Sequence, residues 1–471
     1  MREISVKEIV EITRGVLTRG DPSQRVTGVT VDSRCVAEGD LFCATKGEKV
    51  DGHDYVLDAF SKGAVASLVS REVDVPSNFS PQKAVILVPD TVTALGDLAR
   101  FYLDSLGARV IGVTGSVGKT STKDMIYSVL QKRFRVGKNP GNLNSHIGLC
   151  LAAFQLDPGI EIAILEMAMR AVGEIRYLAS IARPTYGVLT DISQSHIGVV
   201  GSLEKIARGK AELIEALPAG GIAFLAGDNP LIREVTAGVK CRRVFYGFGP
   251  DCQYRAKEVT ILGEEGAAFT LRYPGGEIRA KIPVPGKHQV QNALCAAAVG
   301  IELGMTPDEV VGGLETASLS GMRTALAHTG PLTILDDSYN SSPVSCKAAL
   351  DLLNELPGER KIALLGDMLE LGEWAPEAHR EVGRYAAGRV DVLVTQGDLA
   401  RYIADGAIEA SGTVGRATEV TWVPDRESAR RFLTGALKAG DVVLVKASRA
   451  MKFEEYVEFL KARGREMDAN G

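Results

Sequence analysis

The last third of the chain alternates short apolar runs with amphipathic stretches. The apolar runs that predict strands are Leu332–Asp336, Lys361–Leu365, Asp391–Thr395 and Asp441–Val445. Apolar residues recur at helical spacing in Val344–Glu355, Pro376–Gly388, Arg426–Lys438 and Glu454–Ala462. A strand–helix alternation of this kind is typical of βαβ units around a parallel sheet. It predicts a Rossmann-like, doubly wound domain over residues 321–471.

The middle of the chain contains apolar runs that end in polar residues. The expected strands here are Arg109–Val113, Glu161–Glu166, Tyr186–Asp191 and Gly221–Ala226. Runs without an alternating polar face are typical of parallel strands that are buried on both sides. We expect helices over Ser121–Phe134 and Gln289–Leu303, and a β-rich insert over Arg243–Ile282. The pattern predicts a central domain with a mostly parallel sheet over residues 107–320.

The first 106 residues are less regular. Short strand-like runs occur at Val26–Val31, Asp40–Ala44 and Ala84–Val88, and helix-like stretches at Tyr55–Lys62 and Thr93–Ser105. They predict a mixed α/β domain over residues 1–106. The length of 471 residues is consistent with three domains, since a domain averages roughly 150 residues. The fold class expected for the whole chain is therefore α/β in three domains.

Composition narrows the class of protein. Hydrophobic residues make up 45% and charged residues 24%, which is typical of globular domains. The net charge of −5 argues against a nucleic-acid partner. No apolar run approaches the roughly 18 residues of a membrane span, and the N-terminus lacks the apolar core of a signal peptide. Seven cysteines occur without a Cys-x-x-Cys pair. We therefore expect a cytoplasmic protein with reduced thiols.

The strongest local motif is Val113-Thr-Gly-Ser-Val-Gly-Lys-Thr-Ser121, which follows an expected strand and opens an expected helix. Glycines allow backbone N–H groups to approach phosphate oxygens, and the helix N-terminus favours negative charge. Lys119 would reach the terminal phosphates and the Thr120 hydroxyl would ligate Mg²⁺. The strict motif has glycine where Val113 stands. A plain glycine turn is the alternative interpretation, but it gives no reason for Gly-Lys-Thr at this place.

Three further polar residues have two interpretations each. Glu166 stands at the end of an apolar strand and is either a Mg²⁺ ligand or a solvated charge. His196 follows the next strand, as a metal ligand or as a surface or capping residue. Lys210 lies on an expected helix, where an exposed lysine is the simpler interpretation. Parallel strands would deliver Glu166 and His196 to the sheet edge that carries the phosphate loop.

Together these motifs resemble the Mur ligase superfamily of ATP-dependent amide-forming ligases. The resemblance covers nearly the whole chain in three blocks. Its further motifs are Val31-Asp-Ser-Arg, Gly39–Gly47, Asp51-Gly-His, Asn142–Gly148, Gly286–Ala293, Leu335–Pro343, Leu364–Gly372 and Val445–Arg449. The last block is most similar to the members that join D-alanyl-D-alanine to a UDP-N-acetylmuramoyl tripeptide.

The resemblance implies roles for individual residues. ATP phosphates would be held by Thr114, Gly115, Ser116, Val117, Gly118, Lys119, Thr120 and Ser121. Asn292 would contact the adenine side, and Arg323, Asp337 and Asn340 would close over the nucleotide from the third domain. Thr120, Glu166, His196 and a carbamylated Lys210 would serve Mg²⁺. Lys119, Glu166, His196 and Lys210 would form the catalytic set. Ser33, Arg34, Lys46 and Gly47 would lie near the UDP-sugar.

The activity implied by the resemblance is carbon–nitrogen ligation through an acyl phosphate, with ATP and Mg²⁺ as cofactors. It would serve cytoplasmic synthesis of the peptidoglycan precursor, and hence cell shape and division. The partners would be the two small-molecule substrates, with no nucleic acid and no membrane span, and we expect a monomer.

Alternative functions remain open. A Mur ligase that adds the third amino acid would usually carry Asp-Asn-Pro-Arg, which is absent between Thr395 and Lys446. A folate-polyglutamate ligase would not explain the Asp-Ser-Arg block near the N-terminus. A nucleotide switch would require neither acceptor nor dipeptide, although no guanine-reading Asn-Lys-x-Asp occurs. A sugar-nucleotide binder without turnover is a further alternative.

Overall fold

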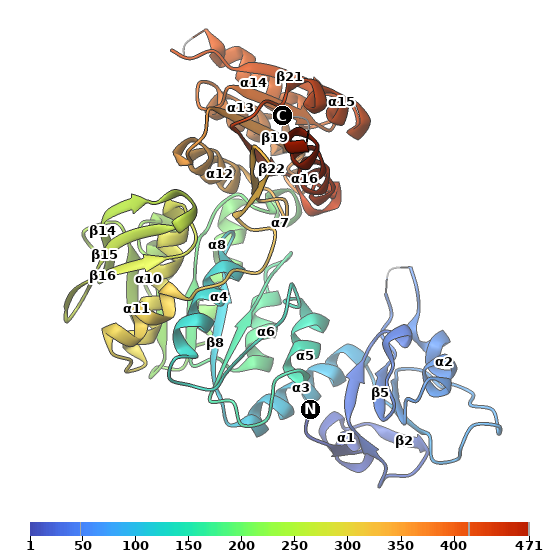
Figure 1. The fold of residues 1–471 in the computed structure, drawn as a ribbon. Helices are drawn as coiled ribbons and strands as arrows, with labels where there is room; N and C mark the ends of the chain where they lie inside the picture. The colour runs from blue at the N-terminus through green and yellow to red at the C-terminus, as the bar shows by residue number, and fades with distance from the viewer. Residues whose placement is uncertain (48, 413–414, 470–471) are drawn as a thin grey trace.

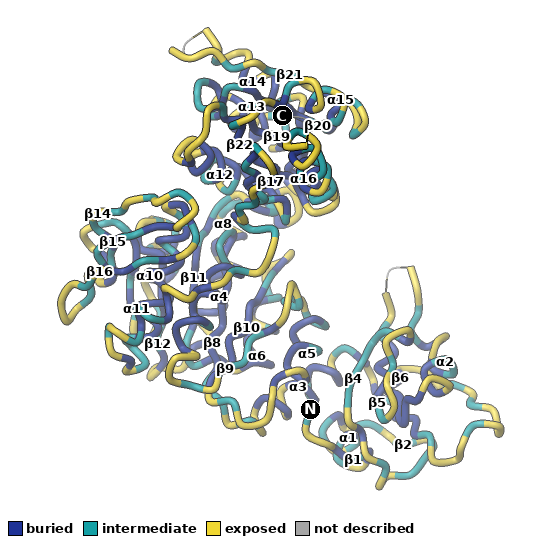
Figure 2. Tube along the Cα trace, in the orientation of Figure 1, coloured by how far each residue is buried: buried dark blue, intermediate teal, exposed yellow. Residues whose placement is uncertain are grey.

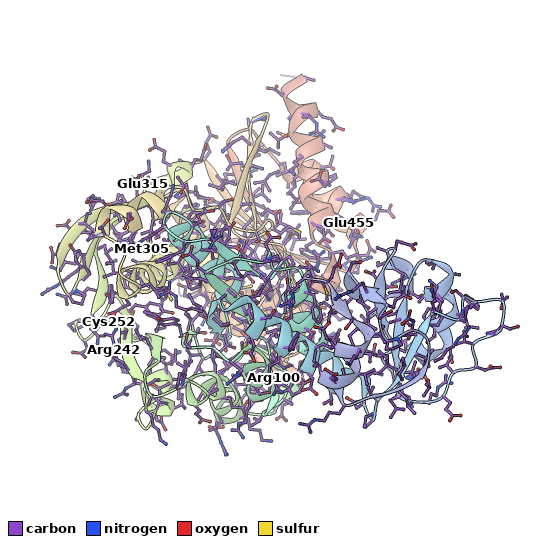
Figure 3. All side chains as sticks on the ribbon, turned by 90° about the horizontal axis from the view of Figure 1, so that it is seen from below. Arg100, Arg242, Cys252, Met305, Glu315 and Glu455 are labelled. Atoms are coloured by element: carbon purple, nitrogen blue, oxygen red, sulfur yellow. The ribbon has the colours of Figure 1, made fainter. Side chains whose placement is uncertain are left out.

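The fold is that of a computed structural model, which describes residues 1–47, 49–412 and 415–469. Three sheets with their helices follow one another along the molecule (Figure 1). The N-terminal part lies at one end and the C-terminal part at the other, with the nine-stranded sheet between them. The strands of the sheets are largely buried, as Figure 2 shows, while Arg100 and Glu315 lie on the outside of the molecule (Figure 3).

The N-terminal part is built on a five-stranded sheet of order β2-β7-β6-β5-β4. The strands are β2 Val16–Arg19, β4 Gly28–Thr30, β5 Asp40–Cys43, β6 Ala66–Val69 and β7 Ala84–Leu87. Only β2 runs antiparallel to its neighbour. The helices are α1 Val6–Thr13, α2 Val56–Ser61 and α3 Thr91–Leu106, and β1 Ile4–Ser5 pairs with β3 Arg25–Val26. The mixed α/β character expected from the sequence is confirmed.

The central sheet has nine strands in the order β16-β15-β14-β13-β12-β11-β8-β10-β9. They are β8 Arg109–Thr114, β9 Val136–Lys138, β10 Ile162–Glu166, β11 Tyr186–Leu189, β12 Ile222–Ala226, β13 Arg242–Gly247, β14 Tyr254–Ile261, β15 Ala267–Tyr273 and β16 Gly276–Ile282. All pairs from β9 to β14 are parallel, and β14, β15 and β16 form an antiparallel meander. The β-rich stretch expected over residues 243–282 therefore continues the central sheet at one edge.

Helices cover the central sheet and carry several of the expected site residues. They are α4 Lys119–Leu130, α5 His146–Phe154, α6 Glu174–Ala182, α7 Ile197–Val200, α8 Leu203–Glu215, α9 Pro230–Val235, α10 Lys287–Glu302 and α11 Pro307–Glu315. Helix α10 packs along α4 and is buried nearly all round, which explains its run of alanines. After α11 an extended segment leads to the third part (Figure 1). Ser320 anchors this segment by donating from its N–H and hydroxyl to Asp124 Oδ2, at 2.8 and 2.7 Å.

The third sheet has the order β17-β18-β22-β19-β20-β21. Its strands are β17 Ala325–Thr329, β18 Leu332–Asp336, β19 Arg360–Gly366, β20 Val392–Gln396, β21 Glu419–Val423 and β22 Asp441–Lys446, and only β17 is antiparallel. The helices are α12 Pro343–Glu355, α13 Ala375–Ala386, α14 Arg401–Ser411, α15 Arg426–Ala436 and α16 Glu454–Ala469. Neighbouring strand residues such as Leu364 and Leu365 enter different apolar clusters. Helices thus cover both faces, and the expected doubly wound fold is confirmed.

Two further expectations concern the whole chain. All seven cysteines lie in the described residues and are free thiols. None of the helices in the described residues has the length and apolar character needed to cross a membrane. The domain boundaries at residues 106 and 320 stay predictions.

Candidate active site at the phosphate loop

The loop between β8 and α4 requires glycine at two positions. Gly115 has a φ of +154°, and a Cβ there would lie 2.0 Å from Thr190 Oγ1. Gly118 has a φ of +81°, and a Cβ there would lie 3.0 Å from Asn292 Oδ1. The Thr190 hydroxyl in turn donates to the Val117 carbonyl at 2.6 Å. These contacts fix the loop against the end of β11. No side chain caps the N-terminus of α4, so its first N–H groups can face a ligand in the loop.

Lys119 folds back over this loop. Its ammonium group donates to the carbonyl oxygens of Gly115 and Ser116, at 2.8 and 3.1 Å. Burial lowers the pKa of Lys119, while the charge of Glu166 opposes that shift. The Lys119 ammonium group therefore lies on the loop carbonyls, where a positive charge suits the terminal phosphates of a nucleotide.

Thr120 and Glu166 are in direct contact. The Thr120 hydroxyl donates to Glu166 Oε2 at 2.8 Å, and Asn144 Nδ2 donates to Oε1 at 2.7 Å. Lys123 Nζ lies 3.5 Å from Oε2, and Glu166 is only 2% exposed. The interpretation of Glu166 as a solvated strand-end charge is therefore wrong. Hydroxyl and carboxylate oxygens are ligands that Mg²⁺ accepts, so this pair fits the expected ion.

Lys210 lies inside the molecule, although it is on a helix. Its Nζ donates to the Gly115 carbonyl at 2.8 Å, and the residue is 3% exposed. Burial moves the pKa of Lys210 well below its usual range, and the charge of Lys119 adds to that shift. The interpretation as an exposed helix lysine is wrong.

Asp191 is a partly buried carboxylate that interacts electrostatically with Lys210. Its Oδ1 accepts from Asn229 Nδ2 at 3.0 Å, whereas Oδ2 is buried without a hydrogen-bond partner among the described residues. Burial raises the pKa of Asp191, and the charge of Lys210 opposes that shift. An unpaired buried carboxylate oxygen is costly, so this atom is a second indication that the site accepts a cation.

His196 reaches the same edge of the sheet but contacts the third part of the chain. It has a φ of +64°, is about half-buried, and its Nδ1 hydrogen-bonds with the Glu370 carboxylate. Burial lowers the pKa of His196, and the charges of Lys119 and Lys210 contribute. The ring therefore lies within electrostatic reach of the phosphate loop.

The described residues contain no group of three or more His, Cys, Asp and Glu side chains placed to hold a metal ion. Mg²⁺ is usually held by one or two protein ligands together with substrate phosphates. The donor set around Thr120 and Glu166 fits that arrangement.

The residues expected at the nucleotide come from two parts of the chain. Asn292 lies on α10 of the central part, whereas Arg323, Asp337 and Asn340 lie in the third part. Asn292 Oδ1 accepts from the Thr122 hydroxyl at 3.0 Å, which connects α10 to α4. The Arg323 guanidinium stacks on the Tyr339 ring at 3.9 Å, and its charge lowers the pKa of Lys119. Arg323 therefore lies within electrostatic reach of the phosphate loop.

Asp337 and Asn340 converge on a third residue. Lys446 Nζ pairs with the Asp337 carboxylate and donates to the Asn340 carbonyl at 2.9 Å. Lys446 is 2% exposed. This buried lysine joins the carboxyl ends of β18 and β22 and was not assigned a role from the sequence.

The four residues expected at the UDP-sugar lie after neighbouring parallel strands. Ser33 and Arg34 form a short 3-10 turn after β4, and Lys46 and Gly47 follow β5. Arg34 pairs with Asp32 at 2.6 Å, and the Gly47 N–H donates to the Val50 carbonyl at 2.9 Å. Their shared sheet edge is compatible with a common ligand.

Comparisons with known proteins match all three parts of the chain. Family models match as "Mur ligase family, catalytic domain" over residues 25–103, "Mur ligase middle domain" over 113–300 and "Mur ligase, glutamate ligase domain" over 322–449. The UDP-N-acetylmuramoyl-tripeptide–D-alanyl-D-alanine ligase of Bacillus subtilis is 41% identical, over 97% of this chain and 98% of its own length. The chain belongs to the Mur ligase family. The overall resemblance predicted from the motifs is thereby confirmed.

Solved Mur ligase structures are similar over nearly the full length. A MurF structure from Acinetobacter baumannii has a TM-score of 0.90 and 27% identity, with 98% of this chain and 99% of that chain covered. The MurF ligase of Thermotoga maritima in complex with ADP has a TM-score of 0.83 and 29% identity, with 94% and 99% covered. Both similarities extend across the three parts, so they support the fold as a whole.

Several residues of this Mur ligase site were not assigned from the sequence. Asn144 and Lys123 contact Glu166, Asp191 lies beside Lys210, and Glu370 contacts His196. Each lies in or next to a quoted motif or an expected strand, but neither of these predicts a contact between distant segments. The individual roles of the predicted site residues stay predictions.

Proposed function

We propose that this Mur ligase joins D-alanyl-D-alanine to UDP-N-acetylmuramoyl-tripeptide with hydrolysis of ATP. The name of the Bacillus subtilis relative supports the substrates, because the similarity runs over nearly the whole of both chains. The observation that carries the proposal is the convergence of Lys119 and Lys210 on the loop that leads to the Thr120–Glu166 pair. This arrangement combines a phosphate site with a buried cation site.

The chemistry requires an activated carboxylate, because a free carboxylate is a poor electrophile. The terminal carboxylate of the tripeptide takes the γ-phosphoryl group of ATP and becomes an acyl phosphate. The dipeptide amine then attacks the carbonyl carbon, the amide forms and phosphate leaves. Lys119 and the N–H groups at the start of α4 offset the negative charge that gathers on the phosphoryl oxygens. Mg²⁺ held by Thr120 and Glu166 would neutralise further charge on the same oxygens.

Lys210 has the properties of a lysine that is carbamylated. Its environment favours the neutral amine, which is the form that adds CO₂ and then releases a proton. The product would carry carboxylate-like oxygens beside the Lys119 ammonium group, where a negative charge is favoured. We include this modification, and metal binding by His196, in the proposal.

The remaining assignments follow the same residues. Nucleotide binding is assigned to residues 114–121 with Asn292, Arg323, Asp337 and Asn340. The UDP-sugar is assigned to Ser33, Arg34, Lys46 and Gly47. We propose a monomer in the cytoplasm, where the soluble precursor and ATP are present.

An amine-acceptor panel tests the proposal. The purified protein is incubated with ATP, Mg²⁺ and UDP-N-acetylmuramoyl-tripeptide, and phosphate release and product mass are measured. D-alanyl-D-alanine should give one phosphate per ligated product. A second arm offers UDP-N-acetylmuramoyl-dipeptide with lysine or diaminopimelate. Product only in the second arm would show that the protein adds the third residue, and phosphate release without any acceptor would indicate a nucleotide switch.

A further inference from the structure

Glu370 contacts three residues of the central part of the chain. It lies in the loop between β19 and α13. Its carboxylate hydrogen-bonds with His196 Nδ1 and lies 3.7 Å from the Arg170 guanidinium. Its backbone carbonyl accepts the N–H of Gly198 at 3.0 Å. The motif Leu364–Gly372 therefore includes a direct contact with the residue expected to serve a metal ion.

The backbone geometry makes this contact specific. Glu370 has a φ of +64°, which is uncommon for a residue with a side chain. A Cβ on Gly198 would lie 2.2 Å from the Gly372 nitrogen, and a Cβ on Gly372 would lie 2.8 Å from the Gly198 Cα. The two segments thus meet backbone to backbone, at a separation that only glycine permits.

The contact also determines which ring nitrogen of His196 is free. A carboxylate at Nδ1 accepts a hydrogen bond, so it favours the tautomer that carries its proton there and leaves a lone pair on Nε2. Histidines that ligate metals usually donate their other ring N–H to a carboxylate or carbonyl, which fixes the ring orientation. The charges of Lys119 and Lys210 act on this ring, so it lies in the electrostatic field of the phosphate loop.

We propose that Glu370 is a positioning residue that orients His196 for a divalent cation, so that docking of the third domain and metal binding stabilise each other. The inference rests on the proposed function, because it assumes that His196 serves the metal. The carboxylate comes from one domain and the imidazole from another, so the oriented pair exists only when the two domains are docked. By linkage, the cation strengthens docking by the factor by which docking strengthens its binding.

Manganese binding to the full-length chain tests this proposal. Free Mn²⁺ is measured by electron paramagnetic resonance during titration in the presence of ADP. Loss of a carboxylate that orients a metal ligand typically weakens metal affinity 10–100-fold, and we expect this for Glu370→Ala. Glu370→Gln should retain most of the affinity, because its amide oxygen still accepts from Nδ1. The matched control is Glu373→Ala, which removes an exposed carboxylate from the same loop and should change nothing.

A double-mutant cycle separates positioning from general damage. If Glu370 acts through His196, adding Glu370→Ala to His196→Ala should weaken Mn²⁺ binding no further. An equal loss in both backgrounds would overturn the proposal, as would unchanged Mn²⁺ affinity in Glu370→Ala or in His196→Ala. Ligation by the wild-type protein is assayed in parallel, so failure of the proposed function appears there and not in the cycle. Far-ultraviolet circular dichroism verifies that each variant is folded.

Discussion

Lys119 and Lys210 both donate a hydrogen bond to the carbonyl oxygen of Gly115, each at 2.8 Å, from the first turn of α4 and from α8. Two ammonium groups on one oxygen repel each other, so the more deeply buried amine loses its proton more easily. Lys119 was predictable from the sequence, because the motif fixes its place after a glycine loop. The burial of Lys210 was not, since a single helix lysine is usually exposed and its partner lies 95 residues away.

Replacement of Lys119 by alanine should abolish ligation in a folded protein. The variant loses the charge that balances the terminal phosphates, and we expect kcat to fall at least about 1,000-fold, or about 4 kcal/mol in the activation barrier. Phosphate release with both acceptors present measures this. Lys438→Ala, which removes an exposed lysine of the third domain, is the control. Normal turnover by a folded Lys119→Ala protein would contradict the phosphate-loop assignment.

Replacement of Lys210 by alanine should also abolish activity, but short carboxylates should restore part of it. The cavity left by the shortened side chain lies beside Gly115, where a small anion can take the place of the carbamate oxygens. Ligation is measured with and without added acetate or formate. Substantial activity of the variant without any additive would count against a functional Lys210.

At the scale of elements, apolar runs located many of the buried strands, although the fully buried β6 was missed, and several strands at sheet edges were missed as well. Strand β22 is buried throughout and was expected, whereas β21 lies at an edge with exposed and half-buried residues. Edge strands bury only part of their surface, so their sequences lack a continuous apolar run. Helix α14 was likewise missed, although its small buried residues pack tightly against α13. Glycines such as Gly406 permit that approach without giving a strong apolar stripe.

A buried histidine, His379, connects α13 to the loop after β19, and its titration predicts a pH effect on stability. His379 is fully buried, accepts the Met368 N–H at 2.9 Å and bonds the Ala375 carbonyl at 2.6 Å. Burial lowers the pKa of His379 to about 4 from 6.5. The unfolded chain therefore takes up a proton before the folded one as pH falls. Stability should be full above pH 6.5, decline between about 6.5 and 4, and level off below that.

Between these two pH values the free energy of unfolding should fall by about 1.4 kcal/mol per pH unit. The third domain should therefore lose about 2 kcal/mol of stability between pH 6.5 and 5. Both tryptophans, Trp374 and Trp422, lie in this domain, and their fluorescence during urea unfolding isolates its transition. His379→Gln should be less stable at pH 7 and should lose most of this slope. A variant with the full wild-type slope would show that another group titrates.

At the scale of the whole molecule, the sequence predicted three parts and their fold classes but not how they touch. The interface between the central and third parts depends on pairs that are far apart in sequence, such as His196 with Glu370 and Gly198 with Gly372. Periodicity within one element contains no information about such pairs. The close approach that both glycines of the second pair permit is visible only in the assembled structure, where the two backbones meet.

Replacement of Gly198 by alanine should separate the third domain from the central one. The new Cβ would lie 2.2 Å from the Gly372 nitrogen and 2.6 Å from its Cα, and backbone atoms cannot yield as a flexible side chain would. We expect a larger radius of gyration by small-angle scattering and at least a tenfold lower kcat. The urea midpoint reported by the tryptophans should stay unchanged, because the core of the third domain is untouched. Gly312→Ala is the matched control, since a Cβ there meets nothing within 4 Å. If Gly198→Ala has the radius of gyration and the kcat of this control, ligation does not depend on the backbone contact. The docking of residues 366–374 on α7 would then have no part in catalysis.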